Sequence, residues 1–257
     1  MLFRSTSTIP GGNGTISGGN STVGAGNDTI QVSGSATIRA AGSTLVFGDG
    51  NVNFIGGTGT STIIGGTGVE SIQAGTGGVV FLDNTANNAT IDSGTGNVTI
   101  FGAPGATVNL VGGASQNVLV AGSGNETLNA AGSSGSNFMS VNASTAGAAT
   151  RMIGGSGADT LVAGAANGAT TMTGGAGADA FVFFKQPAGG ALDVVTDFTS
   201  SDSVFIQGYG GGGSAAGLQA GATVSASGLT LHLNDGTTIT FTNLTNASAL
   251  NGKIQYS

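Results

Sequence analysis

Along most of the chain, a small or polar residue followed by a large apolar one recurs at short intervals. Most successive copies are seven to eleven residues apart, and glycine or asparagine fills the gaps. Threonine and other β-branched residues favour strands, whereas glycine and asparagine tolerate the positive φ angles of tight turns. The pattern therefore predicts very short strands separated by turns, for example at Thr29-Ile30, Thr37-Ile38, Thr62-Ile63, Thr160-Leu161 and Thr171-Met172.

These repeated strands predict an all-β protein, namely a parallel β-solenoid of the β-roll type. One inward apolar residue per strand cannot form a core alone, but stacked coils place these residues in line and bury a continuous column. Helices are disfavoured because glycine in a helix costs about 1 kcal/mol relative to alanine. A flexible linker is disfavoured as well, because linkers do not keep apolar residues on a regular period.

The composition supports a folded chain and narrows its chemistry. Glycine accounts for 51 of 257 residues and charged residues for only 7%, but 39% of residues are hydrophobic, which is too many for a disordered chain. The formal charge of −7 argues against nucleic acid, whose binding needs clustered Lys and Arg, and leaves room for divalent cations. Without cysteine there are no disulfides and no thiolate metal sites.

Neither a secretory signal peptide nor a membrane-spanning stretch is apparent in the sequence. The N-terminal sequence MLFRSTSTIPGGNG lacks the apolar run of a secretory signal peptide, and no stretch approaches the ~20 apolar residues that span a bilayer. We therefore expect no membrane insertion. The chain is expected to be cytoplasmic or to be exported by a route that does not read its N-terminus.

Two segments carry a family resemblance. GGSGADTLV at 154–162 and GGAGADAFV at 174–182 resemble the nonapeptide G-G-x-G-x-D-x-U-x of RTX (hemolysin-type) calcium-binding proteins. GAGNDTIQ at 24–31 is a weaker match, and the copies at 56–64 and 65–73 have Ser61 and Glu70 at the aspartate position. The resemblance implies that the first six residues form a calcium-binding turn and the last three form a strand.

The chemistry of calcium explains the glycines of this motif. Calcium takes six to eight oxygen ligands, many of them backbone carbonyls, which a turn presents freely only where side chains do not obstruct it. The resemblance implies Ca²⁺ as cofactor, held by the carboxylates of Asp159 and Asp179. The companion carbonyls would be those of Gly154, Ser156, Ala158, Gly174, Ala176 and Ala178.

The spacing of the two aspartates departs from the family pattern. Turns that share an ion are two nonapeptides, about 18 residues, apart, whereas Asp159 and Asp179 are 179 − 159 = 20 residues apart. Their pairing requires the segment 163–173 to absorb two extra residues. Asp28 is left open as a ligand, and Asp49 and Glu70 are predicted to be solvated turn residues.

We expect three regions: a largely metal-free solenoid at 1–150, a calcium-binding roll at 151–207 and a C-terminal cap at 208–257. The segment ALDVVTDFTSSDSVFIQGYG at 191–210 resembles the one that follows the last repeats in type I secretion substrates. That resemblance implies that Asp193 helps to close the final calcium sites; Asp202 is predicted to be a surface acid. Within 228–257, alternating apolar residues around Asn234-Asp235-Gly236 predict a β-hairpin, which resembles the uncleaved export signal of such substrates.

No catalytic constellation is apparent, so we do not expect an enzyme. The single histidine, His232, lies within an alternating strand, where a polar outward position explains it. The sequence has no G-x-S-x-G elbow, H-E-x-x-H helix or Walker loop. Repeats begin within the first twenty residues, so the solenoid itself is expected to carry the function.

Three functions remain. The first is a secreted structural protein of a Gram-negative bacterium that self-assembles, head-to-tail or laterally, into a fibre, surface layer or biofilm matrix. An uncapped solenoid end presents unpaired strand edges, and a head-to-tail contact propagates. The second is a binding module, either a calcium-dependent adhesin for a cell-surface polysaccharide or an ice-binding solenoid with outward Thr58, Thr67 and Thr76. The third is the export module of a larger exoprotein. Type I secretion machinery is the other expected partner.

Overall fold

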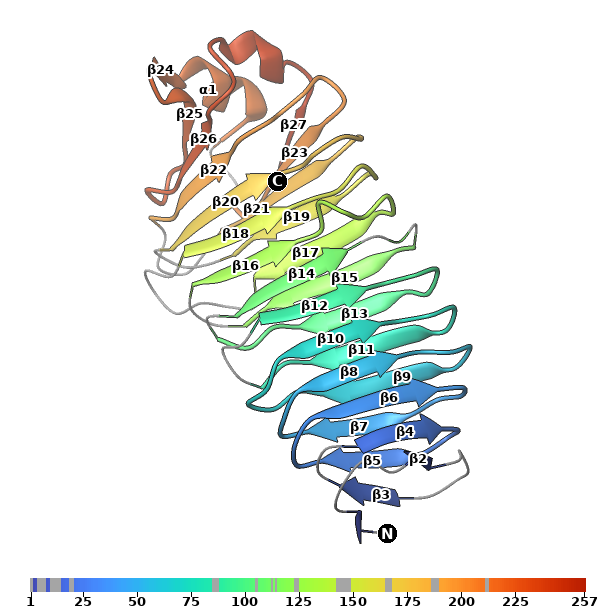
Figure 1. Ribbon diagram of the computed structural model, residues 1–257. Coiled ribbons are helices and arrows are strands. Elements are labelled where there is room, and N and C mark those ends of the chain that lie inside the picture. The colour runs from blue at the N-terminus through green and yellow to red at the C-terminus, as the bar shows by residue number, and fades with distance from the viewer. Residues whose placement is uncertain are drawn as a thin grey trace.

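The chain forms a parallel β-solenoid in which two sheets run along the whole stack (Figure 1). The sheets have 13 and 14 strands, here called sheet A and sheet B, and consecutive strands alternate between them as far as β24. The predicted fold class is confirmed. The computed structural model describes residues 2–3, 8–9, 15–18, 21–84, 88–104, 106–111, 113, 115–122, 125–141, 149–164, 168–185, 190–210 and 213–257.

Sheet A contains the odd-numbered strands. They are β1 (Leu2–Phe3), β3 (Thr15–Gly18), β5 (Thr29–Val32), β7 (Leu45–Gly48), β9 (Thr60–Ile64), β11 (Gly78–Leu82), β13 (Val98–Phe101), β15 (Asn117–Ala121), β17 (Asn137–Val141), β19 (Thr160–Ala163), β21 (Ala180–Phe184), β23 (Ser203–Gln207) and β27 (Ile254–Tyr256).

Sheet B contains the even-numbered strands and β25. They are β2 (Thr8–Ile9), β4 (Ser21–Ala25), β6 (Ala36–Ala40), β8 (Val52–Ile55), β10 (Glu70–Gln73), β12 (Asn88–Asp92), β14 (Thr107–Val111), β16 (Glu126–Asn129), β18 (Ala149–Ile153), β20 (Ala169–Thr173), β22 (Leu192–Val195), β24 (Thr223–Ser225), β25 (Gly228–His232) and β26 (Thr238–Phe241).

Two kinds of turn join the sheets. We call the turns that lead from a sheet B strand into the next sheet A strand A-entry turns; examples are 56–59, 74–77, 154–159 and 174–179. The turns in the other direction, such as 49–51 and 65–69, are B-entry turns. In Figure 1 the turns follow one another along the two edges of the stack.

The core lies between the two sheets and is filled by alternate residues of each strand. In β11, Val79 and Phe81 are buried, whereas Val80 and Leu82 face outward. The sequence pattern led us to expect one inward apolar residue per strand. Most strands instead provide two inward positions, because the side-chain period of a strand is two.

Backbone contact between coils explains much of the glycine. Gly175 has φ +94°, and a Cβ atom at this residue would lie 2.1 Å from the carbonyl oxygen of Gly155 in the preceding coil. Gly177 has φ +126°, and its Cβ would lie 2.3 Å from the Gly157 oxygen. Any other residue would strain the turn and push the coils apart at these positions.

The C-terminal end of sheet B changes from parallel to antiparallel pairing. β26 pairs with β22 in parallel, but β25 pairs antiparallel with β26, and β24 antiparallel with β25. This confirms the predicted hairpin, whose residues Leu229, Leu231, Ile239 and Phe241 are all buried. The helix α1 (Ala215–Ala220) contacts β25, β27 and the 3-10 helix η1 (Ala247–Leu250), and covers this end of the stack.

The predicted boundary at residue 150 does not interrupt the solenoid. β18 pairs with β16 on one side and with β20 on the other, and β17 pairs with β19. The predicted difference between 1–150 and 151–207 is therefore one of turn chemistry within one continuous stack. In the part of the chain that the structure describes, no helix has the length and apolar character needed to cross a membrane.

The alternation of inward and outward residues gives a direct stability prediction. Replacing buried Ile72 by alanine should lower the free energy of unfolding by about 2–5 kcal/mol, because it removes apolar contacts and leaves a cavity. Replacing its exposed neighbour Gln73 by alanine should change it by less than about 0.5 kcal/mol. Urea denaturation of both variants measures the difference, and equal losses would contradict the assigned register.

Candidate metal centre

A single column of residues lies where each A-entry turn meets sheet A. The strand register aligns these positions from coil to coil, and every member is buried. We call this set the A-entry column. Its members are Asp28, Thr44, Ser61, Val79, Val98, Asn117, Asn137, Asp159, Asp179 and Asp202.

The polar members of this column form a ladder between backbone and side chain. The amide of Asn137 donates to Oδ1 of Asp159 at 2.6 Å, the amide of Asp159 to Oδ1 of Asp179 at 2.8 Å, and the amide of Asp179 to Oδ1 of Asp202 at 2.9 Å. The same geometry recurs upstream, where the amide of Val98 donates to Oδ1 of Asn117 at 3.2 Å. Each side chain thus binds the amide of the preceding coil and helps to fix the register.

The remaining oxygens of the three aspartates face their own turns. Oδ2 of Asp159 accepts a 2.7 Å bond from the amide of Gly155, and Oδ2 of Asp202 accepts a 2.7 Å bond from that of Thr199. Oδ2 of Asp179 is buried and has no hydrogen-bond partner. A Cβ atom at Gly174 would lie 2.4 Å from this oxygen, and a Cβ atom at Gly154 would lie equally close to Oδ2 of Asp159. Glycine therefore leaves the space that each carboxylate occupies.

Stacking carboxylates inside the fold raises their proton affinity. The pKa of Asp179 is raised to about 7, chiefly by burial and also by the negative charges of Asp202, Asp159 and Asp197, against the lowering effect of the hydrogen bond from the Asp159 amide. Burial also raises the pKa of Asp159, against the hydrogen bonds from Gly155 and Asn137. At neutral pH this column favours positive charge, either protons or a cation.

Asp159 and Asp179 are brought together as the sequence predicted. The 20-residue interval keeps the pairing because both A-entry turns have the same six-residue pattern, so the extra residues lie between them within 160–173. Part of the segment that was expected to absorb them, 165–167, lies outside the described residues. The six expected carbonyl donors belong to these two turns, on adjacent coils. Their role as metal ligands stays a prediction.

The expectation for Asp202 was wrong. It is 2% exposed and stacks on Asp179 in the A-entry column, because the turn 196–202 occupies the place of the glycine turns before it. Asp197 lies in the same turn, and its two carboxylate oxygens accept 2.8 Å hydrogen bonds from the amides of Gly174 and Gly175. A sequence signal existed: Asp202, like Asp159 and Asp179, directly precedes a small residue and an apolar strand.

Asp193 is separate from these three carboxylates. It lies on β22 in sheet B, near the B-entry side, where its Oδ1 accepts a 3.1 Å bond from the amide of Thr170. Apolar and aromatic residues, among them Phe183 and Tyr209, line the space around it. The pKa of Asp193 is raised to about 7, chiefly by burial and to a smaller extent by the charge of Asp235, against the hydrogen bonds from Thr170. The structure therefore does not place Asp193 beside Asp159 and Asp179.

The remaining acids lie in three different places: the A-entry column, the surface and the inward side of sheet B. Asp28 belongs to the A-entry column, but its neighbour in the next coil is Thr44, and its Oδ2 accepts a 2.7 Å bond from the amide of Gly26. Asp49 is exposed, as predicted. Glu70 was predicted to be solvated, which is wrong: it is 1% exposed, because it occupies an inward position of β10. Burial and then the charge of Asp83 raise its pKa to about 7.

A cation at the Asp159–Asp179–Asp202 segment would need backbone ligands. Within the described ranges, no group of three or more His, Cys, Asp or Glu side chains is arranged to hold a metal ion. The buried, partnerless Oδ2 of Asp179 nevertheless fits a hard cation, which binds carboxylate and carbonyl oxygens together.

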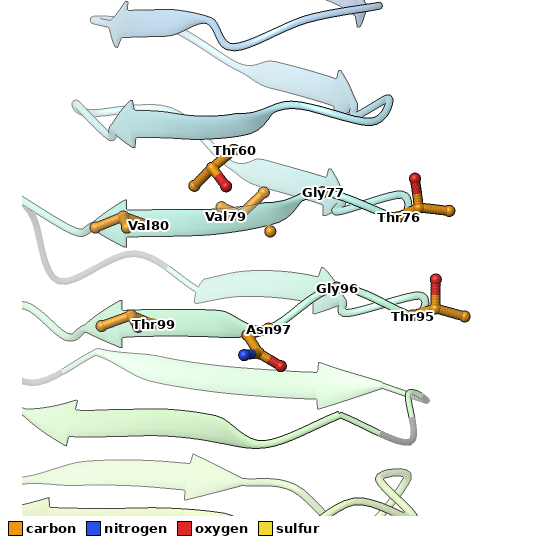
Figure 2. A pocket seen from close by; sticks show the side chains of 10 residues that line it. Thr60, Thr76, Gly77, Val79, Val80, Thr95, Gly96, Asn97 and Thr99 are labelled. Atoms are coloured by element: carbon orange, nitrogen blue, oxygen red, sulfur yellow. The ribbon is translucent and has the colours of Figure 1, made fainter.

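A hollow of about 470 Å³ lies beside the A-entry turns of β11 and β13, but only Thr, Gly, Val and Asn residues line it (Figure 2). Thr76 and Thr95 stand one above the other at the edge of successive turns (Figure 2). Thr58 and Thr76 lie on A-entry turns and Thr67 on a B-entry turn, so only the first two share an edge. His232 is exposed on the hairpin, where its Nε2 lies 2.8 Å from Oγ1 of Thr223.

Comparison with known proteins adds no family: no protein-family model matches the chain, and no curated protein matches it.

Glu70, which lies outside the A-entry column, allows a test of whether burial raises the pKa of a carboxyl group in this fold. Its pKa is raised from 4.5 to about 7 in the folded state, so its contribution to stability is complete below about pH 4.5 and is lost as the pH rises through 7. In EGTA at pH 8, Glu70→Gln should therefore raise the free energy of unfolding by about 2 kcal/mol, with almost no change at pH 5. Urea denaturation at both pH values measures this. Exposed Asp49→Asn serves as control, and an equal effect at pH 5 and pH 8 would argue against a buried titrating Glu70.

Proposed function

We propose that this chain is a secreted, calcium-binding structural protein that self-assembles into an extracellular fibre, surface layer or biofilm matrix. The observation that carries the proposal is the stack of Asp159, Asp179 and Asp202, each of which is the last residue of one of three successive A-entry turns. Three buried carboxylates in adjacent coils repel one another unless protons or a cation neutralise them. The resemblance of 154–162 and 174–182 to RTX repeats favours calcium.

In this proposal the metal acts on folding. Calcium would be held by Asp159, Asp179, Asp202 and carbonyls of the turns 154–159 and 174–179, and it would supply the positive charge that the column lacks. Because a preformed site is absent from the unfolded chain, the free energy of binding becomes free energy of folding. A chain of this kind stays loosely folded where calcium is scarce and folds where calcium is abundant, which suits export through type I secretion machinery to the outside of a Gram-negative cell.

Asp179→Asn tests the metal role through opposite effects in two buffers. In EGTA at pH 8, the substitution should raise the free energy of unfolding by about 1–3 kcal/mol, because it removes a buried like charge whose pKa is about 7. In saturating calcium, the variant should be less stable than the wild type, because a site filled at 1,000 times its dissociation constant contributes about 4.1 kcal/mol, more than the gain from removing the charge. Urea denaturation in both buffers measures the pair, and exposed Asp49→Asn is the control.

An effect of Asp179→Asn with the same sign in both buffers would point to a purely structural role. The position of the acids extends the test. Asp202→Asn should weaken calcium binding, measured by isothermal titration, as Asp179→Asn does, because both lie in the A-entry column. Asp193→Asn should leave it unchanged, because Asp193 lies in the other sheet. Loss of binding in Asp193→Asn alone would contradict the assignment of the site.

Assembly itself is tested by refolding the chain with 5–10 mM calcium or with EGTA, concentrations on the order of those that fill weak extracellular sites. Negative-stain electron microscopy should show filaments or sheets with calcium only. Folded monomers at every protein concentration would contradict the assembly and would favour the alternative, a calcium-dependent adhesin.

A further inference from the structure

The outer face of sheet A carries an unbroken row of large apolar residues. Phe47, Ile64, Leu82, Phe101 and Val120 occupy equivalent positions on β7, β9, β11, β13 and β15, because each is the register partner of the next. These side chains point away from the core. Phe47, Leu82 and Phe101 are 40%, 36% and 43% exposed.

A second row runs beside the first on the same strands. It alternates aliphatic residues with threonine and ends on an aromatic residue that is 41% exposed, Phe138 on β17. Its members are Leu45, Thr62, Val80, Thr99, Val118 and Phe138. We call the two rows together the hydrophobic face. Neither the core nor the aspartate stack uses it.

The opposite side of the same coils is more polar and carries charges. One outward row on sheet B contains Asn53, Ser71, Thr90 and Asn109, and the next row mixes apolar with polar and charged residues, namely Arg39, Ile55, Gln73, Asp92 and Val111. By contrast, none of the outward residues on the sheet A strands from β5 to β23 is charged. The same turns and the same core support both faces, so this difference is not imposed by the fold. A contiguous exposed apolar patch of this kind marks an interaction site.

We propose that the hydrophobic face docks on the same face of a second copy of this chain, and this step rests on the self-assembly proposed above. A face without charges buries no unpaired ion when it meets an equal face, whereas a charged partner would lose hydration without compensation. The spacing of the row residues along the stack is also the same in the two copies. Both copies place one row residue per coil, every ~4.8 Å, so their ridges can interlock as they do between packed sheets about 10 Å apart.

The available area is sufficient for a stable pair. The nine sheet A strands from β7 to β23 present an outer surface without charged residues, and the hydrophobic face covers the first six of these strands. At ~4.8 Å per strand and a strand length of roughly 15 Å, this whole surface measures roughly 650 Å² per copy. Two such faces bury roughly 1,300 Å², within the range of specific interfaces. Because the contact joins the same patch on both copies, it closes as a two-fold dimer. The dimer would then be the unit that a fibre or layer repeats through other contacts.

Adding charge to the hydrophobic face tests the proposed dimer in the calcium-refolded full chain. The double variant Leu82→Lys/Phe101→Lys should weaken dimerisation at least ~100-fold, measured by sedimentation velocity over a concentration series, because it buries two uncompensated charges per copy. The matched control is Gln73→Lys/Thr90→Lys, which adds the same charges to the exposed side of sheet B in neighbouring coils and should leave dimerisation unchanged. Far-UV circular dichroism checks that both variants fold.

A second variant covers the case in which the lysines disturb folding. Leu82→Ser/Phe101→Ser adds no charge and should weaken dimerisation at least ~10-fold through lost apolar burial. If the wild type assembles and both face variants assemble equally well, the hydrophobic face is not the contact, and the proposed function stands without it. If the wild type forms the face-dependent dimer but no calcium-dependent polymer, the inference holds and the proposed function fails. A wild type that stays monomeric overturns the inference.

Discussion

Parallel, in-register pairing between successive coils is the constraint on which every other feature depends. It places each residue about 4.8 Å from its equivalents above and below, so any property of one position is repeated as a line along the axis. Apolar inward residues become a continuous core. Turn positions with no space for a Cβ atom become glycine, as at Gly175 and Gly177. A carboxylate placed once per coil becomes a stack of like charges, and an outward phenylalanine becomes part of a hydrophobic row.

That repetition also decides how much the sequence could reveal. The strand-turn rhythm, the solenoid, the C-terminal hairpin and the meeting of Asp159 with Asp179 all follow from local patterns, because each depends on residues within a few positions of a turn. Asp202 was misjudged because its turn has the sequence DFTSSD instead of glycines, so the motif that marks the column is absent although the position is kept. Glu70 was misjudged because spacing alone does not say which of two alternating faces points inward.

The hydrophobic face could not be predicted from the sequence pattern, for a related reason. Phe47, Ile64, Leu82 and Phe101 are 17, 18 and 19 residues apart, so no fixed period connects them, and each is flanked by residues that the core buries. Only the register shows that they form one row. The same is true of the amide-to-side-chain ladder, in which Asn117 and Asn137 continue the aspartate stack with a neutral group of similar shape. The exchange of Asn for Asp within one ladder locates the excess charge at one end of the stack.

The coils of the A-entry column differ in length: its polar contacts span 17 residues near the N-terminal end and 22, 20 and 23 residues near the C-terminal end. The hydrogen-bonded side chains nevertheless stay aligned, so their alignment does not depend on the number of residues in each coil. The extra residues of the longer coils lie between the hydrogen-bonded positions. The fold is thus a frame that tolerates insertions, and peptide segments grafted into its loops would be displayed in a line along the stack while the ladder beneath them keeps its register.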